Sequence, residues 1–195
     1  MNCRATLLSA KHWVSLRNAD VAISVLWKNL KHRTKTAANA LNLVLRYDVL
    51  IEPAVTVKYW RSISFGEKCT LQSCSYVYGS RRGLSVEFGN HVVVAHASMI
   101  LGEGGVEIGD FTHLGPQTVL TTQYGDSRSE SRTSAPSVKY AKVKIGAGCW
   151  IGSGSVIMPG TILGDRCIVS PNSVVFGRWR DGTVLSGNPA RAQKR

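Results

Sequence analysis

The stretch IGAGCWIGSGSVIMPGTILGDRCIVSPNSVV, residues 145–175, repeats with a period of six residues. Isoleucine, leucine or valine stands at every sixth place, at positions 145, 151, 157, 163, 169 and 175. A small residue stands four places after each of the first five: Cys149, Ser155, Thr161, Cys167 and Ser173. Neither the period of about 3.6 residues of a helix nor the alternation of an ordinary strand explains this pattern. A hexad repeat predicts a mainly β fold, a parallel β-helix with aliphatic residues inside and small residues at its corners.

The same frame continues towards the N-terminus with interruptions. Leu120, Leu114 and Ile108 keep the six-residue spacing. An insertion at Gly104 and Gly105 interrupts it, and the spacing then resumes with Ile100, Val94 and Phe88. A looser match continues back to Ile51. Because three hexads make one turn, the repeat predicts about seven turns. We expect the β-helix over residues 51–178, with a polar loop over residues 121–144 that is thrown out from one turn and either builds a binding face or is only a surface insertion.

Two segments flank the predicted β-helix. Residues 1–50 contain VAISVLWKNLKHRTKTAANALNLVLRY, which has no proline or glycine and predicts a helical segment. Eight lysines and arginines stand against two aspartates up to residue 48. This segment therefore either caps the open end of the solenoid and packs against another subunit, or lies on an anionic membrane surface. Residues 179–195 form a basic C-terminal tail.

The composition indicates which kinds of binding partner and which cellular compartment to expect. Lysine and arginine total 24 against 12 acidic residues, so the net charge of +12 favours an anionic partner: a phosphorylated cofactor, an acidic lipid or nucleic acid. Nucleic acid is not expected, because the basic residues are dispersed and no nucleic-acid motif is present. The five cysteines contain no C-x-x-C, which predicts neither a disulfide framework nor a zinc knuckle. No stretch reaches the roughly 20 apolar residues of a membrane span, so we expect a cytoplasmic protein, soluble or peripheral at the membrane.

Three stretches resemble a known family. GEGGVEIGDFTHLGPQTVL, then VKIGAGCWIGSGSVIMPGTILGDRCIVSPNSVV, and finally VLSGNPARAQKR are similar to the hexapeptide-repeat acyltransferases, in particular to the sugar O-acetyltransferases of surface-polysaccharide gene clusters. The resemblance covers roughly residues 84–195. It implies a left-handed β-helix, a homotrimer with active sites between subunits, and acetyl-CoA as the donor to a sugar or glycan acceptor.

Acyl transfer to a hydroxyl needs a base with a pKa near neutrality, and histidine is the natural one. The family places its histidine just after the segment that here reads LGPQTVL. The corresponding residues are Gln123, Tyr124 and Gly125, and none of them is a base at neutral pH. Asp126 follows, but an exposed aspartate with a pKa of about 4 is a weak base.

Two histidines inside the repeat are alternative bases. His113 is the last residue of its hexad and His96 the third of its own. These positions resemble those of two histidines in the amino-sugar N-acetyltransferases, so His113 is the first candidate and His96 the second. Either ring could instead only hydrogen-bond a neighbouring turn. His91 and His96 also resemble the zinc ligands of γ-class carbonic anhydrases, but the repeat before His91 contains no third histidine, so no metal is predicted.

The resemblance also implies donor-binding residues. The positions that match the pantetheine groove are Trp150, Gly152 and Ser173. Those that match the segment meeting the adenine and 3′-phosphate of CoA are Asn188, Arg191 and Lys194. Arginine and lysine suit phosphates by charge and geometry, although the tail could equally be only solvated.

Together these observations predict an acetyl-CoA-dependent O-acetyltransferase of a sugar or polysaccharide precursor in surface glycan biosynthesis. The loop over residues 121–144 would shape the acceptor pocket, and Arg128 and Arg132 would hold an anionic acceptor. The alternative is a non-catalytic β-helix that has lost the family histidine and serves in binding or assembly. Retention of the basic GNPAR segment favours the enzyme, because an assembly subunit has no use for it.

Overall fold

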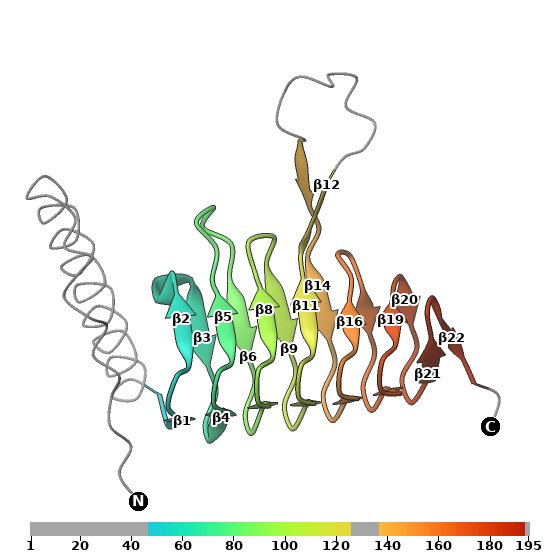
Figure 1. Cartoon of the computed structure of the whole chain (residues 1–195), viewed down its shortest axis with the longest axis horizontal. Helices are drawn as coiled ribbons and strands as arrows, with labels where there is room; N and C mark the ends of the chain where they lie inside the picture. Colours follow the sequence, from blue (N-terminus) through green and yellow to red (C-terminus); the bar gives the residue numbers. More distant parts are fainter. Residues whose placement is uncertain (1–46, 126–136, 194–195) are drawn as a thin grey trace, which may run out of the picture. The chain divides into compact units, whose positions relative to one another are not determined.

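The computed structural model of the chain describes residues 47–125 and 137–193. Within these ranges the backbone winds in successive turns. Each full turn contributes one short strand to each of three sheets, and strands of successive turns pair in parallel (Figure 1). The chain forms a left-handed parallel β-helix, so the predicted fold class is confirmed. The helical segment expected over residues 1–50 lies outside the described residues up to residue 46, together with its expected cap, subunit or membrane contacts.

Sheet A has eight strands: β1 (Val49–Ile51), β4 (Cys69–Leu71), β7 (Val93–Val94), β10 (His113–Leu114), β15 (Trp150–Ile151), β18 (Ile168–Val169), β21 (Val184–Gly187) and β22 (Ala190–Ala192). Sheet B has six: β2 (Thr56–Lys58), β5 (Tyr76–Tyr78), β8 (Met99–Leu101), β11 (Val119–Thr121), β16 (Val156–Ile157) and β19 (Val174–Val175). Sheet C has six: β3 (Ile63–Phe65), β6 (Val86–Phe88), β9 (Val106–Ile108), β14 (Val143–Ile145), β17 (Ile162–Leu163) and β20 (Arg178–Trp179). The described residues therefore make six full turns, fewer than the seven or so expected, and two further strands, β21 and β22, which lie within the segment expected as a basic tail.

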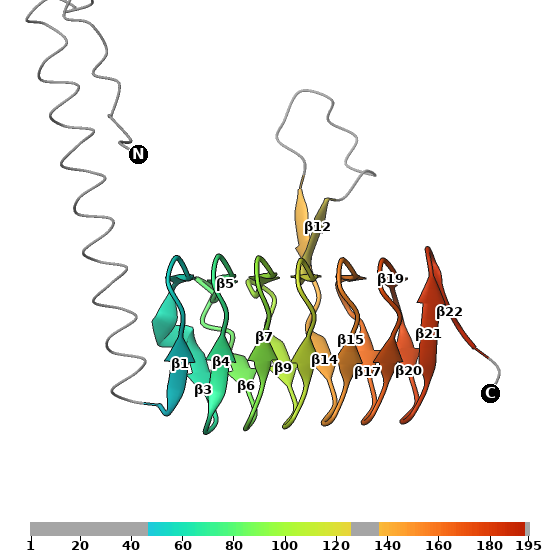
Figure 2. The ribbon, with the colours of Figure 1, turned by 60° about the horizontal axis from the view of Figure 1, so that its bottom comes forward.

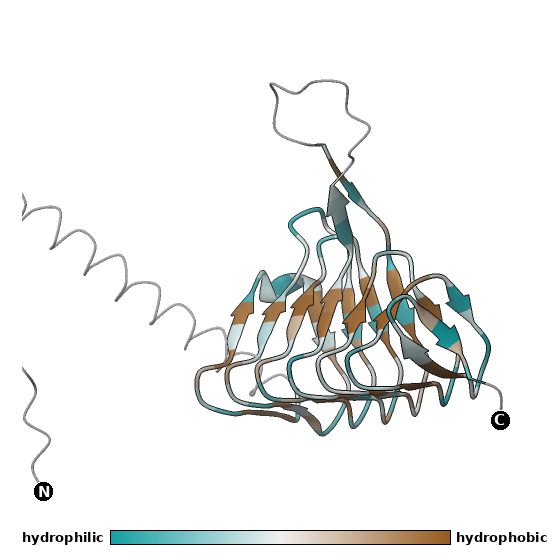
Figure 3. Ribbon diagram, turned by 45° about the vertical axis from the view of Figure 1, so that its right-hand side comes forward, coloured by the Kyte–Doolittle hydropathy of each residue, from teal (hydrophilic) through white to brown (hydrophobic). Residues whose placement is uncertain are grey.

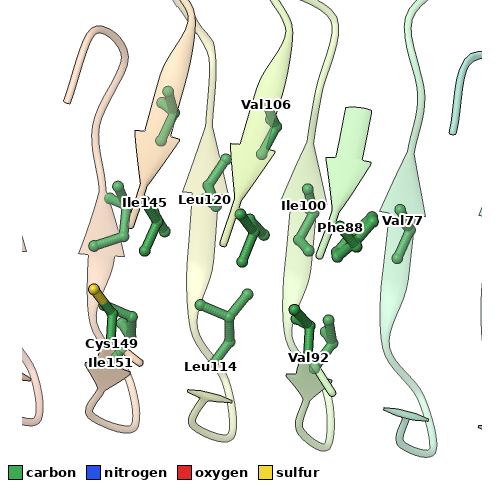
Figure 4. Packing of buried hydrophobic residues seen from close by; sticks show 14 of the residues in the cluster. Val77, Phe88, Val92, Ile100, Val106, Leu114, Leu120, Ile145, Cys149 and Ile151 are labelled. Carbon is green, nitrogen blue, oxygen red and sulfur yellow. The ribbon is translucent and has the colours of Figure 1, made fainter. Parts of the chain in front are cut away.

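The hexad positions line the interior of the solenoid. Along sheet A, Leu114 pairs with Ile151, Ile151 with Val169 and Val169 with Leu185, and all four side chains are fully buried. Aliphatic residues from all three sheets meet in this one column (Figure 4). Burying each large aliphatic side chain contributes about 1.5–3 kcal/mol, so the repeat is the main source of stability. The strands that carry them appear as brown segments in Figure 3.

The small residues of the hexads fill the corners, as predicted. Ser155 and Thr161 are fully buried, and their hydroxyls donate to the backbone carbonyls of Ser170 at 3.0 Å and Met158 at 2.7 Å. Cys149 is also buried at a corner. Most buried hydroxyls in proteins are hydrogen-bonded, and these two donate to backbone carbonyls at the corners.

The solenoid has one large excursion, between β11 and β14. Its base is an antiparallel pair, β12 (Gln123–Gly125) and β13 (Val138–Tyr140), which projects away from the turns (Figure 2). The described part of the expected loop is thus a hairpin stem, and residues 126–136, with Arg128 and Arg132, lie outside the description. The helical structure in the described ranges is the short 3-10 helix η3 (Trp60–Ser62), and these ranges contain no helix long and apolar enough to span a membrane.

Candidate active site

The first candidate base, His113, lies on the outer face of sheet A. It is the first residue of β10, and because the next residue, Leu114, points into the core, the imidazole points outward. Its strand neighbour is Trp150 on β15. The two rings stack with centroids 4.6 Å apart and planes inclined by 10°. The structure therefore joins the predicted base to one of the predicted donor-binding residues.

The stack changes the acid–base properties of His113. The imidazole is partly buried, and burial lowers the pKa of His113 below its ordinary value of 6.5 because it disfavours the charged form. At neutral pH the ring is therefore neutral and able to accept a proton. Trp150 covers one face of the ring, while its own side chain is 56% exposed. A base beside an exposed aromatic surface is suited to receive a substrate from the solvent side.

His96, the second candidate, lies at the corner between β7 and β8. Its side chain is exposed, and its backbone N–H donates to Oε1 of Gln72 at 3.2 Å. Nearby, Glu52 accepts bonds from the hydroxyl of Ser73 at 2.7 Å and its backbone N–H at 2.8 Å. These bonds, and to a lesser extent the charge of His96, lower the pKa of Glu52. In the described ranges no hydrogen bond or ring contact joins His96 to His113, so the structure does not pair the two candidates.

The expected pantetheine positions differ in what they can offer. Trp150 presents an exposed ring, but a Cβ added at Gly152 would lie 2.5 Å from the backbone nitrogen of Pro171 in the next turn. Glycine is thus required there for contact between turns. The Ser173 hydroxyl is fully buried and accepts a bond from the backbone N–H of Gly187 at 3.1 Å. Trp150 is the member of this set whose side chain faces solvent.

The predicted phosphate-binding residues lie at the C-terminal end of the solenoid. Asn188 is exposed in the turn between β21 and β22, and Arg191 is exposed on β22. The Arg191 guanidinium makes a 3.4 Å bond to the carbonyl of Ala190, which leaves most of its donors directed to solvent. Lys194 and the weak-base candidate Asp126 lie outside the described residues.

The residues expected at the position of the family histidine form strand β12. Gln123 and Tyr124 are exposed on the hairpin stem, and the Tyr124 side chain is 45% exposed. No group of three or more metal-ligating side chains is found in residues 47–125 and 137–193. The stem therefore presents an amide and a phenol where the family has an imidazole.

The sequence analysis missed a cluster at the corner between sheets B and C. Glu103 is only 3% exposed, and its Oε1 lies 3.3 Å from Nε of Arg81. Tyr59 and Tyr78 lie in the same cluster, with ring centroids 4.9 Å apart. Burial and a hydrogen bond with Tyr59 raise the pKa of Tyr78 to about 12, so the phenol remains protonated. The sequence signal was an unusual one: a charged residue, Glu103, inside a glycine-rich turn of the repeat.

Comparison with known proteins agrees with this architecture. The family described as bacterial transferase hexapeptide (six repeats) matches residues 142–177. WbbJ of Escherichia coli (strain K12), named for O-acetyl transfer in lipopolysaccharide biosynthesis, is 30% identical over 142 residues, which cover 69% of this chain and 72% of WbbJ. A β-helix with hexad repeats and this degree of identity defines an acyltransferase fold. The chain belongs to the hexapeptide-repeat acyltransferases.

Two solved structures are similar in fold. A variant of AntD, an N-acyltransferase from Bacillus cereus in complex with dTDP-4-amino-4,6-dideoxyglucose and coenzyme A, superposes with a TM-score of 0.68 at 23% identity, covering 75% of this chain and 80% of AntD. A maltose O-acetyltransferase from Clostridium difficile 630 superposes with a TM-score of 0.57 at 25% identity, covering 78% and 72%.

Proposed function

We propose that this protein is an acetyl-CoA-dependent O-acetyltransferase that modifies a sugar or glycan precursor of a surface polysaccharide. The observation that carries the proposal is the His113–Trp150 stack, which places a neutral imidazole beside an exposed aromatic ring on one face of the solenoid. The similarity to WbbJ, named for O-acetyl transfer in lipopolysaccharide biosynthesis, supports the reaction and the class of acceptor. We further propose that the protein works in the cytoplasm as a homotrimer.

In the proposed reaction, His113 acts as a general base. Its imidazole accepts the proton of an acceptor hydroxyl while the hydroxyl oxygen attacks the thioester carbon of acetyl-CoA. The carbon–sulfur bond then breaks, and the imidazolium returns the proton to the departing thiolate. The lowered pKa of His113 suits the first step, because the ring begins the cycle without a proton. Trp150 holds the imidazole plane fixed during both transfers.

Donor binding in this proposal uses two exposed elements. Trp150 offers a surface for the pantetheine arm, and Arg191 offers guanidinium donors for phosphate. Gly152 and Ser173 contribute by shaping the turns, since the space beside Gly152 is filled by the next turn and the Ser173 hydroxyl is buried. The net charge of +12 attracts the anionic donor to the protein.

The test is acetyl-CoA binding by calorimetry and acetyl transfer by release of CoA thiol, on wild type and His113→Ala. We expect both proteins to bind acetyl-CoA and the variant to lose about 10²–10⁴-fold in turnover, the usual contribution of a general base. The matched control is His91→Ala. His91 stacks on Phe111 with centroids 4.7 Å apart and planes inclined by 8°, so this variant removes an equivalent ring pair without the proposed base.

Equal loss in His91→Ala and His113→Ala would assign both rings to packing and overturn the role of His113. Wild type that binds no acetyl-CoA and acetylates no acceptor would favour the other candidate function, a binding or assembly subunit. That alternative rests on the presence of Gln123 and Tyr124 where the family has its histidine.

A further inference from the structure

Two consecutive arginines extend from the corner between sheets B and C. Arg81 and Arg82 belong to residues 79–85, which connect β5 to β6. The equivalent connection in the next turn, residues 102–105, contains Glu103, and the one after it is the β12–β13 stem. Together with Lys142 and Lys144, which flank the start of β14, we call these residues the basic corner.

Arg81 is positioned by the buried carboxylate of Glu103. Its backbone N–H and its Nε–H each lie 3.3 Å from a different carboxylate oxygen of the buried Glu103. The Ser80 hydroxyl donates to the Glu103 carbonyl at 3.0 Å, and the Ser80 N–H donates to the hydroxyl of Ser62 at 2.8 Å. Within the described ranges the terminal amino groups of the Arg81 guanidinium have no hydrogen-bond acceptor. The guanidinium is therefore oriented by one bond and retains its other donors for a ligand.

Arg82 is oriented by a different contact. Its backbone N–H donates to the Ser80 hydroxyl at 3.0 Å, and its guanidinium carbon lies 4.7 Å from the centroid of the Tyr140 ring on β13. No carboxylate pairs with Arg82 among residues 47–125 and 137–193. A guanidinium stacked on an aromatic ring keeps all its N–H donors in the plane, where they can bind a phosphate in a bidentate way.

The charges of the basic corner do not cancel. Lys142 and Lys144 share the carboxylate of Glu107, and Arg81 pairs with Glu103, so among the described residues of the basic corner Arg82 is the cation without a carboxylate partner. The guanidinium carbon of Arg81 lies 5.9 Å from the centroid of the Tyr59 ring, which is 44% exposed. Fixed guanidinium groups with aromatic surfaces nearby fit a compound that carries a diphosphate and a planar or apolar moiety.

We propose that the basic corner binds the diphosphate of an activated sugar acceptor, with Arg82 as the principal phosphate ligand and Arg81 as the second. The proposal rests on the proposed acyltransfer to a sugar and specifies its substrate class. Because the basic corner joins sheets B and C while His113 lies on the outer face of sheet A, the sugar bound at this corner would meet the His113 of another subunit of the proposed homotrimer. The sugar diphosphate could be joined to a nucleoside or to a polyprenyl lipid, and the chemistry at Arg81 and Arg82 is the same for both.

Calorimetry with UDP and with geranyl diphosphate tests the site without any acyl donor, and uridine is the probe without phosphate. We expect wild type to bind both diphosphates and not uridine, and Arg82→Ala to weaken diphosphate binding by about 10- to 100-fold, as for a lost charge-assisted bidentate contact. The matched control is Arg178→Ala, an exposed arginine on β20 that should bind like wild type. Tighter binding of UDP supports the nucleotide form, and tighter binding of geranyl diphosphate the lipid-linked form.

Three outcomes would overturn the proposal: equal weakening by Arg82→Ala and Arg178→Ala, uridine binding as tightly as UDP, or a loss in Arg82→Ala that affects acetyl-CoA instead of the diphosphates. Failure of the proposed function is distinguishable, because absence of acetyl transfer with intact UDP binding rejects the enzyme and supports the diphosphate site. Arg82 is exposed, so the variant should fold, and equal melting temperatures of the variant and wild type verify this.

Discussion

The hexad spacing is strict in the C-terminal half of the solenoid, from β14 onward, and looser in the N-terminal half, from β1 to β11. In the C-terminal half, Ile151 pairs with Val169 in the next turn, a spacing of 18 residues, which three hexads account for. In the N-terminal half, Ile51 pairs with Leu71 and Leu71 with Val94, at spacings of 20 and 23 residues. The extra residues lie at corners and leave the core unchanged. The comparison teaches that the core tolerates added length wherever the chain turns.

The irregular corners also carry the charged contacts. Arg81 pairs with Glu103 across two connections that exceed the hexad spacing, and Arg82 reaches Tyr140 on the hairpin stem. By contrast, the tight corners of the C-terminal half contain small buried groups such as Ser155 and Cys167. Regular corners thus contain small buried groups, and the longer connections between sheets B and C carry exposed charged and aromatic groups.

The largest expected effect concerns the core of the regular half. Ile157→Ala removes a fully buried side chain between three turns and should lower the free energy of unfolding by about 2–5 kcal/mol. Ile51→Ala, at a partly exposed site in the first described turn, should cost distinctly less. Urea unfolding followed by circular dichroism measures both. Equal losses would show that the partly exposed N-terminal site contributes as much to stability as the buried C-terminal one and would remove the distinction.

A second prediction concerns the stack of His113, in the N-terminal half, on Trp150, in the C-terminal half. Trp150→Ala exposes the imidazole and should raise the pKa of His113 towards 6.5. In wild type the unfolded chain takes up this proton at a higher pH than the folded one, so stability falls as the pH drops below about 6.5. NMR titration of the histidine ring measures the shift, and the acid limb of kcat/KM should move upward with it.

The control for this titration is Phe111→Ala, which removes the ring stacked on His91 and should leave the titration of His113 unchanged. A shift of equal size in both variants would mean that the whole outer face, and not Trp150, determines the pKa.

The smallest effect is chemical and compares two corner cysteines. Cys74 is exposed at the corner between β4 and β5 in the N-terminal half, whereas Cys149 is buried at a corner of the C-terminal half, and burial raises the pKa of Cys149 to about 11. At pH 8 only about one thiol in a thousand of this kind is ionised, so Cys74 should react with iodoacetamide while Cys149 remains unmodified. Peptide mapping by mass spectrometry checks this, with Cys74→Ser as control. Fast labelling of Cys149 would indicate that the regular half opens readily.

The sequence predicted the solenoid because its signal is local and repeated. Leu114, Ile151 and Val169 occupy the interior as their spacing requires. Trp150 and His113 each precede such a position and lie in one column of sheet A, which the sequence analysis did not predict. Their separation in sequence concealed this, because the excursion after β11 lies between them. The partners of Glu103 could not be predicted, since contacts between connections of unequal length depend on the path of each connection.

The base of the hairpin has a wider consequence. The N–H of Ala141 donates to the carbonyl of Thr122 at 2.8 Å, so the two ends of the excursion close on each other before β14 resumes the winding. The packing of the turns on either side is thus independent of how many residues lie between Thr122 and Ala141. This position is one where evolution, or a protein engineer, can exchange a binding segment or insert a whole domain while the register of the scaffold stays the same.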